Sequence, residues 1–250
     1  MSQPSGHRDT GAGAVGYTET TLTAAWPQRL FPLVRQLSRR VTPILLRFPI
    51  TPNHITLAAM AAGLSASWCL YVGTPAAAVA GCLLFIAGQV LDNCDGEVAR
   101  LKGLQSRLGG LLDDTGDWLV HSSLFVALGA HATAVDGRAL WFWLGVATAA
   151  GVFCEYVIGL TRSSGDPAAE PELVADDPTA SVSPFDLPGE FRRMDKAVYV
   201  LRVLIDADFC FMLPVFVLSG TVWILLAAAA VGNQVYWMAS FYEGARRFRA

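Results

Sequence analysis

The chain has 250 residues, of which 53% are hydrophobic and only 16% charged, and its mean hydropathy is +0.42. These values exclude an ordinary soluble domain and indicate an integral membrane protein. The formal net charge of -3 says little about partners, because acidic and basic residues are unevenly distributed along the chain. The five cysteines are odd in number and lie mostly in apolar runs, which argues against a disulfide framework and against a zinc site.

The N-terminal part of the chain predicts a leader and an interfacial helix. Residues 1–20 are polar and rich in glycine without an apolar core, so we expect residues 1–25 to form a disordered cytoplasmic leader and not a cleavable signal peptide. In residues 26–47, apolar side chains recur at helical spacing among arginines. This pattern predicts an amphipathic juxtamembrane helix that lies on an anionic membrane face.

The remaining chain, residues 50–250, is predicted to form one membrane domain. Residues 209–242 are an uncharged stretch of 34, too long for one crossing at about 1.5 Å per residue, with a natural break at 219–221. The helix before this break is expected to start near residue 196. Four further runs can each span a bilayer: about 54–73, 75–91, 118–134 and 139–154, the last extending to 160. We therefore expect an all-α integral membrane protein with six transmembrane helices after the interfacial helix.

Basic residues predict the orientation of these helices. Of the 18 Lys and Arg residues, 16 fall in the N-terminal segment, the two long connections or the C-terminus, all on one predicted side. By the positive-inside tendency, both termini and these connections face the cytoplasm, and we expect the inner membrane. The longest connection, residues 163–191, has seven acids, five prolines and no Lys or Arg, which predicts a mobile loop. The basic C-terminus is interpreted as a lipid-headgroup anchor and not as a nucleic-acid site.

Six acidic side chains stand between the second and third apolar runs, in LDNCDGEVARLKGLQSRLGGLLDDTGDW at 91–118. If the two helices face one another, four carboxylates converge at low dielectric, and their repulsion requires compensation. Oxygen ligands favour Mg²⁺ or Mn²⁺ over zinc, and two such ions would balance four carboxylates. Two sets of residues each share one helical face: Asp92, Asp95, Gly96 and Ala99, and Gly109, Asp113 and Asp117.

Other residues of this stretch suit a bulky phosphate ligand. Gly96 and Gly109 remove side chains where a ligand must approach the helices, and Arg100 can offer a planar fork to a phosphate. Glu97 and Asp114 lie off the two faces. This favours exposure to water, or contact with a metal-binding residue, over direct binding of a metal ion.

The stretch reads D-x2-D-G-x2-A-R-x8-G-x3-D-x3-D and resembles the signature of the CDP-alcohol phosphotransferase (CDP-alcohol phosphatidyltransferase) family, class I. The resemblance extends to the six-helix plan, to the preceding amphipathic helix and to TPNHIT at 51–56. It implies Mg²⁺-dependent transfer of a phosphate-substituted alcohol from a CDP-alcohol to an acceptor alcohol, with release of CMP. It also implies membrane lipids as partners and a homodimer.

The resemblance further implies roles for single residues. Two Mg²⁺ ions, replaceable by Mn²⁺, would be held by Asp92 and Asp113, which contact both ions, by Asp95 on one ion and by Asp117 on the other. Asp117 would also act as general base. The residues expected near the CDP moiety are Gly96, Arg100, Ser106 and Gly109, with Asn53 and Thr56 from the start of the first transmembrane helix.

Several assignments stay open at this stage. Arg162, Arg202 and Asp206 are candidates for acceptor binding, although Arg202 and Asp206, at i and i+4, can equally form a structural pair. The expected donor is CDP-diacylglycerol in phospholipid biosynthesis, and the alternative is a soluble CDP-alcohol such as CDP-inositol. The acceptor can be glycerol 3-phosphate, inositol phosphate, serine or an amino alcohol. Two other functions also compete: a membrane prenyltransferase and a non-enzymatic cation transporter.

Overall fold

The computed structural model describes residues 32–164 and 208–247, and its secondary structure within these ranges is entirely helical. The all-α expectation is therefore confirmed for this part of the chain. The predicted leader, the acidic loop beyond residue 164, Arg202 and Asp206 lie outside the described residues.

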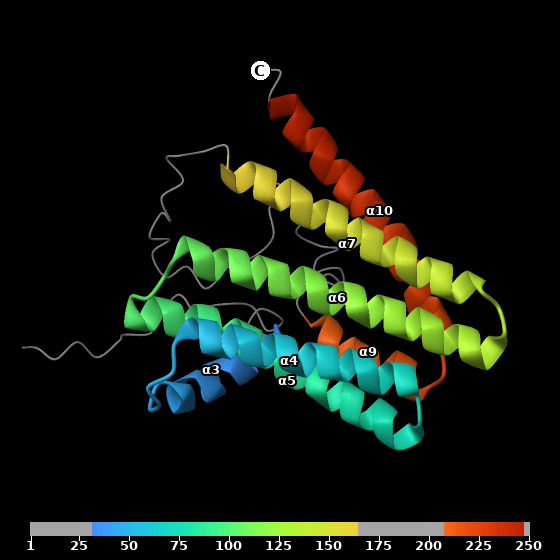
Figure 1. Cartoon of the computed structure of the whole chain (residues 1–250), viewed down its shortest axis with the longest axis horizontal. Coiled ribbons are helices and arrows are strands. Elements are labelled where there is room, and N and C mark those ends of the chain that lie inside the picture. The colour runs from blue at the N-terminus through green and yellow to red at the C-terminus, as the bar shows by residue number, and fades with distance from the viewer. Residues whose placement is uncertain (1–31, 165–207, 248–250) are drawn as a thin grey trace, which may run out of the picture.

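Seven helices are described, and they run as a bundle (Figure 1). Four of them, α4 to α7, are long and apolar enough to cross a membrane, whereas α9 and the apolar part of α10 are shorter. The six-helix plan therefore stays a prediction beyond these four. The bounds are α3 (Leu33–Leu45), α4 (Pro52–Val72), α5 (Pro75–Lys102), α6 (Arg107–Asp136), α7 (Leu140–Ser164), α9 (Phe209–Leu218) and α10 (Val222–Arg247).

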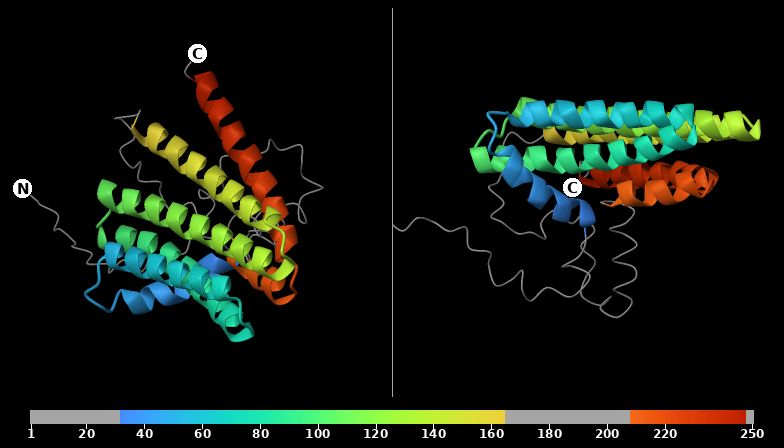
Figure 2. Two further views of the ribbon diagram at one scale, coloured as in Figure 1. Left: turned by 45° about the vertical axis from the view of Figure 1, so that its right-hand side comes forward. Right: turned by 90° about the horizontal axis from the view of Figure 1, so that it is seen from below.

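The contacts between helices determine which residues can come together in a site. Helix α4 packs against both α5 and α6, α7 packs against α6 and α10, and α3 packs against α5. Figures 1 and 2 show that the α3–α4 and α5–α6 connections lie at one end of the bundle, and that the α4–α5, α6–α7 and α9–α10 turns lie at the other. The acidic stretch between α5 and α6 is therefore at the same end as α3.

Helices α5 and α6 both continue well beyond the predicted apolar runs. The backbone of α5 remains helical to Lys102, where Gly103 ends it in the left-handed conformation at φ 62° and donates its N–H to the Ala99 and Arg100 carbonyls. Helix α6 begins at Arg107, and the side chain of its N-cap residue Ser106 accepts the Gly109 N–H at 3.0 Å. All the motif aspartates therefore stand on helices.

Glycines bring α4, α5 and α6 close together. A Cβ atom on Gly63 would lie 2.5 Å from Cγ1 of Val120, and one on Gly88 would lie 3.2 Å from the Ala59 carbonyl oxygen. These helices therefore approach each other more closely than larger residues would allow, and the acidic ends of α5 and α6 are brought together over α4.

Helix α3 covers residues 33–45 of the segment predicted as an amphipathic juxtamembrane helix, and its place on a membrane face stays a prediction. Its buried residues, Val34, Ser38 and Thr42, share one face. Its first turn is capped from far along the chain, because the Asp208 carboxylate accepts the Leu33 N–H at 2.7 Å and the Val34 N–H at 2.9 Å.

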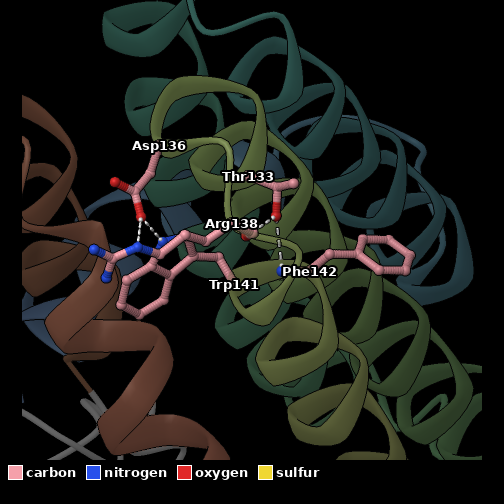
Figure 3. A network of polar contacts seen from close by, with 5 residues as sticks. All are labelled: Thr133, Asp136, Arg138, Trp141 and Phe142. Atoms are coloured by element: carbon pink, nitrogen blue, oxygen red, sulfur yellow. Dashed lines mark hydrogen bonds and ion pairs between the residues drawn. The ribbon is translucent and has the colours of Figure 1, made fainter.

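The opposite end of the bundle carries a polar network at the α6–α7 turn (Figure 3). Asp136 accepts the indole N–H of Trp141 at 2.6 Å and lies 3.4 Å from Nε of Arg138. The Thr133 hydroxyl accepts the Phe142 N–H at 3.0 Å and donates to the Arg138 carbonyl. Arg138 is one of the two basic residues outside the 16 that were assigned to the cytoplasmic side. The network orders the turn and is remote from the acidic motif.

Candidate functional site

Three carboxylates converge where α5 and α6 face one another. Asp92 and Asp95 come from α5 and Asp113 from α6, and each offers one oxygen within 4.8 Å of the others. Asp95 is buried, with 4% of its surface exposed, and the other two are partly buried. The helical faces predicted from the spacing therefore meet. Carboxylates this close repel each other strongly when partly withdrawn from water, so the cluster favours a bound cation.

The donor set fits a divalent cation that prefers oxygen. Oδ1 of Asp113 is buried, and no hydrogen-bond partner reaches it among the described residues. A buried oxygen without a donor is costly, and a metal ion would satisfy it. Carboxylate oxygens alone suit Mg²⁺ or Mn²⁺ and give no reason to expect zinc.

Asp117 occupies a different place from these three residues. It follows Asp113 by one helical turn, it is exposed, and it does not belong to the set of oxygens within 4.8 Å. Asp92 and Asp117 line the same small cavity between α4, α5 and α6. Its other lining residues are Ala59, Met60, Gly63, Phe85, Gly88, Gln89, Gly116 and Val120. Asp117 is thus exposed and also borders this cavity beside Asp92.

Thr56 lies directly against the acidic cluster. Its hydroxyl, which is buried, donates to Oδ2 of Asp95 at 2.5 Å and also lies 3.2 Å from the Pro52 carbonyl oxygen. Sequence reasoning had placed Thr56 near the CDP moiety, and the structure places it where it orients an aspartate. Such partners hold a metal-binding carboxylate in one direction.

The other residues predicted to contact the nucleotide form two groups. The guanidinium of Arg100 folds back along α5, so that Nη1 lies 3.3 Å from where a Cβ on Gly96 would be. On the α6 side, the Gly109 position is bordered by Oγ of Ser106 at 3.0 Å and Oδ1 of Asn53 at 3.3 Å from the same hypothetical atom. Arg100 therefore lies beside Gly96, and Ser106 and Asn53 lie beside Gly109.

The candidate acceptor residues are not brought to this cluster by the described part of the structure. Arg162 lies on α7, and its side chain is not among those described, while Arg202 and Asp206 lie outside the described residues. The expectation about them stays a prediction.

Sequence reasoning missed two contacts of α3. Glu97 accepts hydrogen bonds from the hydroxyls of Ser38 and Thr42, each at 2.6 Å, and Asp208 caps the first turn of the helix. Ser38 and Thr42, at i and i+4 on the apolar side of an amphipathic helix, were a usable signal that this face meets a polar partner. Both carboxylate oxygens of Glu97 therefore contact hydroxyls of α3.

The part of the chain that carries the aspartate cluster also resembles known proteins. Residues 49–169 match the family model described as CDP-alcohol phosphatidyltransferase. These residues include α4, the acidic motif of α5 and α6, and α7.

Three relatives illustrate the range of similarity. An archaetidylinositol phosphate synthase of Pyrococcus horikoshii is 36% identical over 40% of this chain and 53% of its own length. A bifunctional IPC transferase and DIPP synthase of Thermococcus kodakarensis is 33% identical over 45% of this chain and 24% of its own length. A CDP-diacylglycerol–glycerol-3-phosphate 3-phosphatidyltransferase of Rickettsia bellii is 32% identical over 31% of this chain and 42% of its own length.

The chain spans between a quarter and about half of the length of these relatives. The matched part holds every fixed position of the acidic motif, from Asp92 to Asp117. Residues 49–169 therefore carry a region similar to the CDP-alcohol phosphatidyltransferase family, which supports the resemblance found in the acidic motif.

Proposed function

We propose that the chain is a Mg²⁺-dependent CDP-alcohol phosphotransferase. It would move a phosphate-substituted alcohol from a CDP-alcohol to an acceptor alcohol and release CMP. The observation that carries this proposal is the convergence of Asp92, Asp95 and Asp113, with a buried oxygen of Asp113 that no donor reaches among the described residues. Neither a prenyltransferase nor a cation transporter gains support from the family match.

In this proposal the three clustered aspartates hold the cation, and Thr56 keeps Asp95 oriented toward it. When bound, divalent ions neutralise charge on the diphosphate of the donor. Asp117 accepts the proton of the acceptor hydroxyl, and that oxygen forms a bond to the β-phosphorus while the bond from this phosphorus to CMP breaks. The exposure of Asp117 and its place in the cavity beside Asp92 support this role.

The nucleotide would lie over the two glycine positions. Arg100 would bind a phosphate of the donor beside Gly96, and Ser106 and Asn53 would border the donor beside Gly109. We propose CDP-diacylglycerol as donor, because the site is on helices that can cross a membrane. The names of the relatives include an archaetidylinositol phosphate synthase and a glycerol-3-phosphate phosphatidyltransferase, so phosphorylated alcohols are the first acceptors to test.

The proposal also covers the orientation of the chain in the membrane and its oligomeric state. We infer six membrane-spanning helices, with both termini and the acidic site on the cytoplasmic side of the inner membrane, from the distribution of Lys and Arg. The family resemblance leads us to propose a homodimer. Accessibility labelling of single cysteines on each side of the membrane tests the orientation.

The direct test of the activity is CMP release by the purified full chain. CDP-diacylglycerol and CDP-inositol are compared as donors, each with glycerol 3-phosphate, inositol phosphate, serine and an amino alcohol as acceptors. We expect CMP with one donor and acceptor pair, loss of the activity in EDTA, and recovery with Mg²⁺ or Mn²⁺. Equal turnover in metal-free buffer would contradict the metal assignment. If none of the donor and acceptor pairs yields CMP, the transferase assignment is wrong.

A further inference from the structure

Helix α3 is held in one orientation on the end of α5. Both carboxylate oxygens of Glu97 accept a hydroxyl from α3, one from Ser38 and one from Thr42. Beyond the end of α3, Nζ of Lys102 donates to the Ile50 carbonyl at 2.8 Å and lies 3.3 Å from the Phe48 carbonyl oxygen. Together with the Asp208 cap, these contacts fix α3 along its whole length, so the side chains beside its buried face have a defined position.

Arg35 and Arg39 border the contact between α3 and α5. Arg35 is partly buried and stands one turn before Ser38, whose hydroxyl also contacts the Arg35 carbonyl at 3.1 Å. Arg39 is one turn further along the same side, four residues after Arg35. Arg100 stands on α5 three residues, about one helical turn, after Glu97, which accepts the two hydroxyls of α3. Three guanidinium groups are therefore brought to the border of two helices.

The positive charge at this border is not balanced within the described residues. Burial, followed by the charges of Arg100 and Arg39, lowers the pKa of the Arg35 guanidinium, while Glu97 raises it. Glu97 supplies one negative charge against three guanidinium groups, and within the described ranges no carboxylate forms an ion pair with Arg35. A partly buried guanidinium beside two like charges is stabilised by an anion, and the planar fork of arginine matches phosphate oxygens.

We propose that Arg35, Arg39 and Arg100 form a phosphate-binding site between α3 and α5, next to the aspartate cluster. The sequence predicts a phosphate contact for Arg100, whereas it assigns no role to Arg35 and Arg39. The phosphate can belong to the headgroup of a membrane phospholipid or to a water-soluble phosphate ester, and both present the same chemistry. The site goes beyond the proposed transfer reaction, because binding of a phosphate to these three arginines requires neither a metal ion nor turnover.

The test measures binding to the full chain in neutral detergent with EDTA, where no transfer can occur. Glycerol 3-phosphate is titrated by calorimetry as the soluble probe. Phosphatidic acid is added as the lipid probe and followed by native mass spectrometry, with diacylglycerol as the control that lacks a phosphate. The variants are Arg35→Gln and Arg35→Lys. The matched control is Arg40→Gln, an exposed arginine of α3 that helical geometry places on the opposite side from Ser38.

Wild-type protein is expected to bind at least one phosphate probe, and which probe it binds identifies the source of the phosphate. Arg35→Gln should weaken this binding about tenfold or more, Arg35→Lys should weaken it less because it keeps the charge, and Arg40→Gln should leave it unchanged. The proposal is overturned if wild type binds neither probe, or if Arg35→Gln and Arg40→Gln weaken binding equally. If Arg35→Gln does not fold, the exposed Arg39→Gln replaces it in the same comparison. Binding without CMP release would refute the transferase and leave this site intact.

Discussion

The hydroxyl of Thr56 on α4 donates a hydrogen bond to Oδ2 of Asp95 on α5, and both residues are buried. This contact joins the start of the first long apolar helix to the acidic motif 39 positions later. It gives the TPNHIT segment a physical reason to occur beside the aspartates, since it positions one of them.

Replacing Thr56 by valine keeps the shape of the side chain and removes the donor. We expect metal affinity, measured by Mn²⁺ titration, to fall roughly 10- to 100-fold, because Asp95 is no longer held in one orientation. Thr56→Ser restores the hydroxyl and should recover most of the affinity. Equal affinity in the valine and wild-type proteins would show that the hydrogen bond has no role in the site.

Ser38 should contribute to stability through Glu97. The side chain of Ser38 is fully buried, and Ser38→Ala leaves one oxygen of Glu97 without its donor, at a cost of about 1–3 kcal/mol. For a chain of this size we expect the unfolding temperature in detergent to fall by roughly 2–4 °C per kcal/mol. Ser65→Ala, at an exposed position of α4, is the control. An unfolding temperature that falls equally in both variants would refute this contribution.

The sequence predicted the positions of the membrane helices better than their lengths. The predicted run ending at 91 continues as α5 to Lys102, and the run beginning at 118 starts as α6 at Arg107. Hydropathy reports contact with lipid, whereas backbone hydrogen bonds continue through charged residues until Gly103 ends α5. The helical faces of Asp92 and Asp113 could be predicted because they depend only on local spacing.

Contacts between distant segments could not be predicted in the same way. Asp208 and Leu33 are 175 positions apart, and no periodicity in either segment identifies the other as its partner. The contact of Glu97 with α3 was missed for the same reason. Such pairs depend on how whole helices pack, which spacing within one helix does not encode.

The close approach of α4 and α6 should be sensitive to one added methyl group. Gly63→Ala places a Cβ against both methyl groups of Val120, at 2.5 and 2.7 Å, and we expect a loss of about 1–3 kcal/mol in thermal unfolding. Adding Val120→Ala should recover part of this loss, because it frees the same space. Gly232→Ala, which meets no atom within 4 Å inside α10, should not destabilise the protein. Additive losses in the Gly63 and Val120 double variant would contradict this packing.

Asp117 should affect turnover more than binding. Asp117→Asn keeps the size of the side chain but cannot accept the proton, so we expect CMP release to fall on the order of 10²-fold or more while donor binding is largely retained. Asp92→Asn should instead weaken metal and donor binding together. If Asp117→Asn turns over at near the wild-type rate, or loses donor binding as fully as Asp92→Asn, Asp117 is not the general base.

The aspartate cluster is tested most directly by two adjacent carboxylates with different surroundings. Asp113 belongs to the converging set and carries the buried oxygen without a donor, whereas its neighbour Asp114 is exposed and lies outside that set. Asp113→Asn and Asp114→Asn therefore remove the same charge from consecutive positions. In EDTA, we expect Asp113→Asn to unfold at a higher temperature than wild type, because it relieves repulsion among buried carboxylates.

The decisive measurement is Mn²⁺ binding, followed by electron paramagnetic resonance, beside CMP release from the CDP-alcohol that wild type uses. The account predicts that Asp113→Asn loses at least tenfold in Mn²⁺ affinity and nearly all CMP release, while Asp114→Asn keeps both. Wild-type Mn²⁺ affinity and CMP release in Asp113→Asn, or the same loss in both variants, would contradict a metal-dependent transferase site at this cluster.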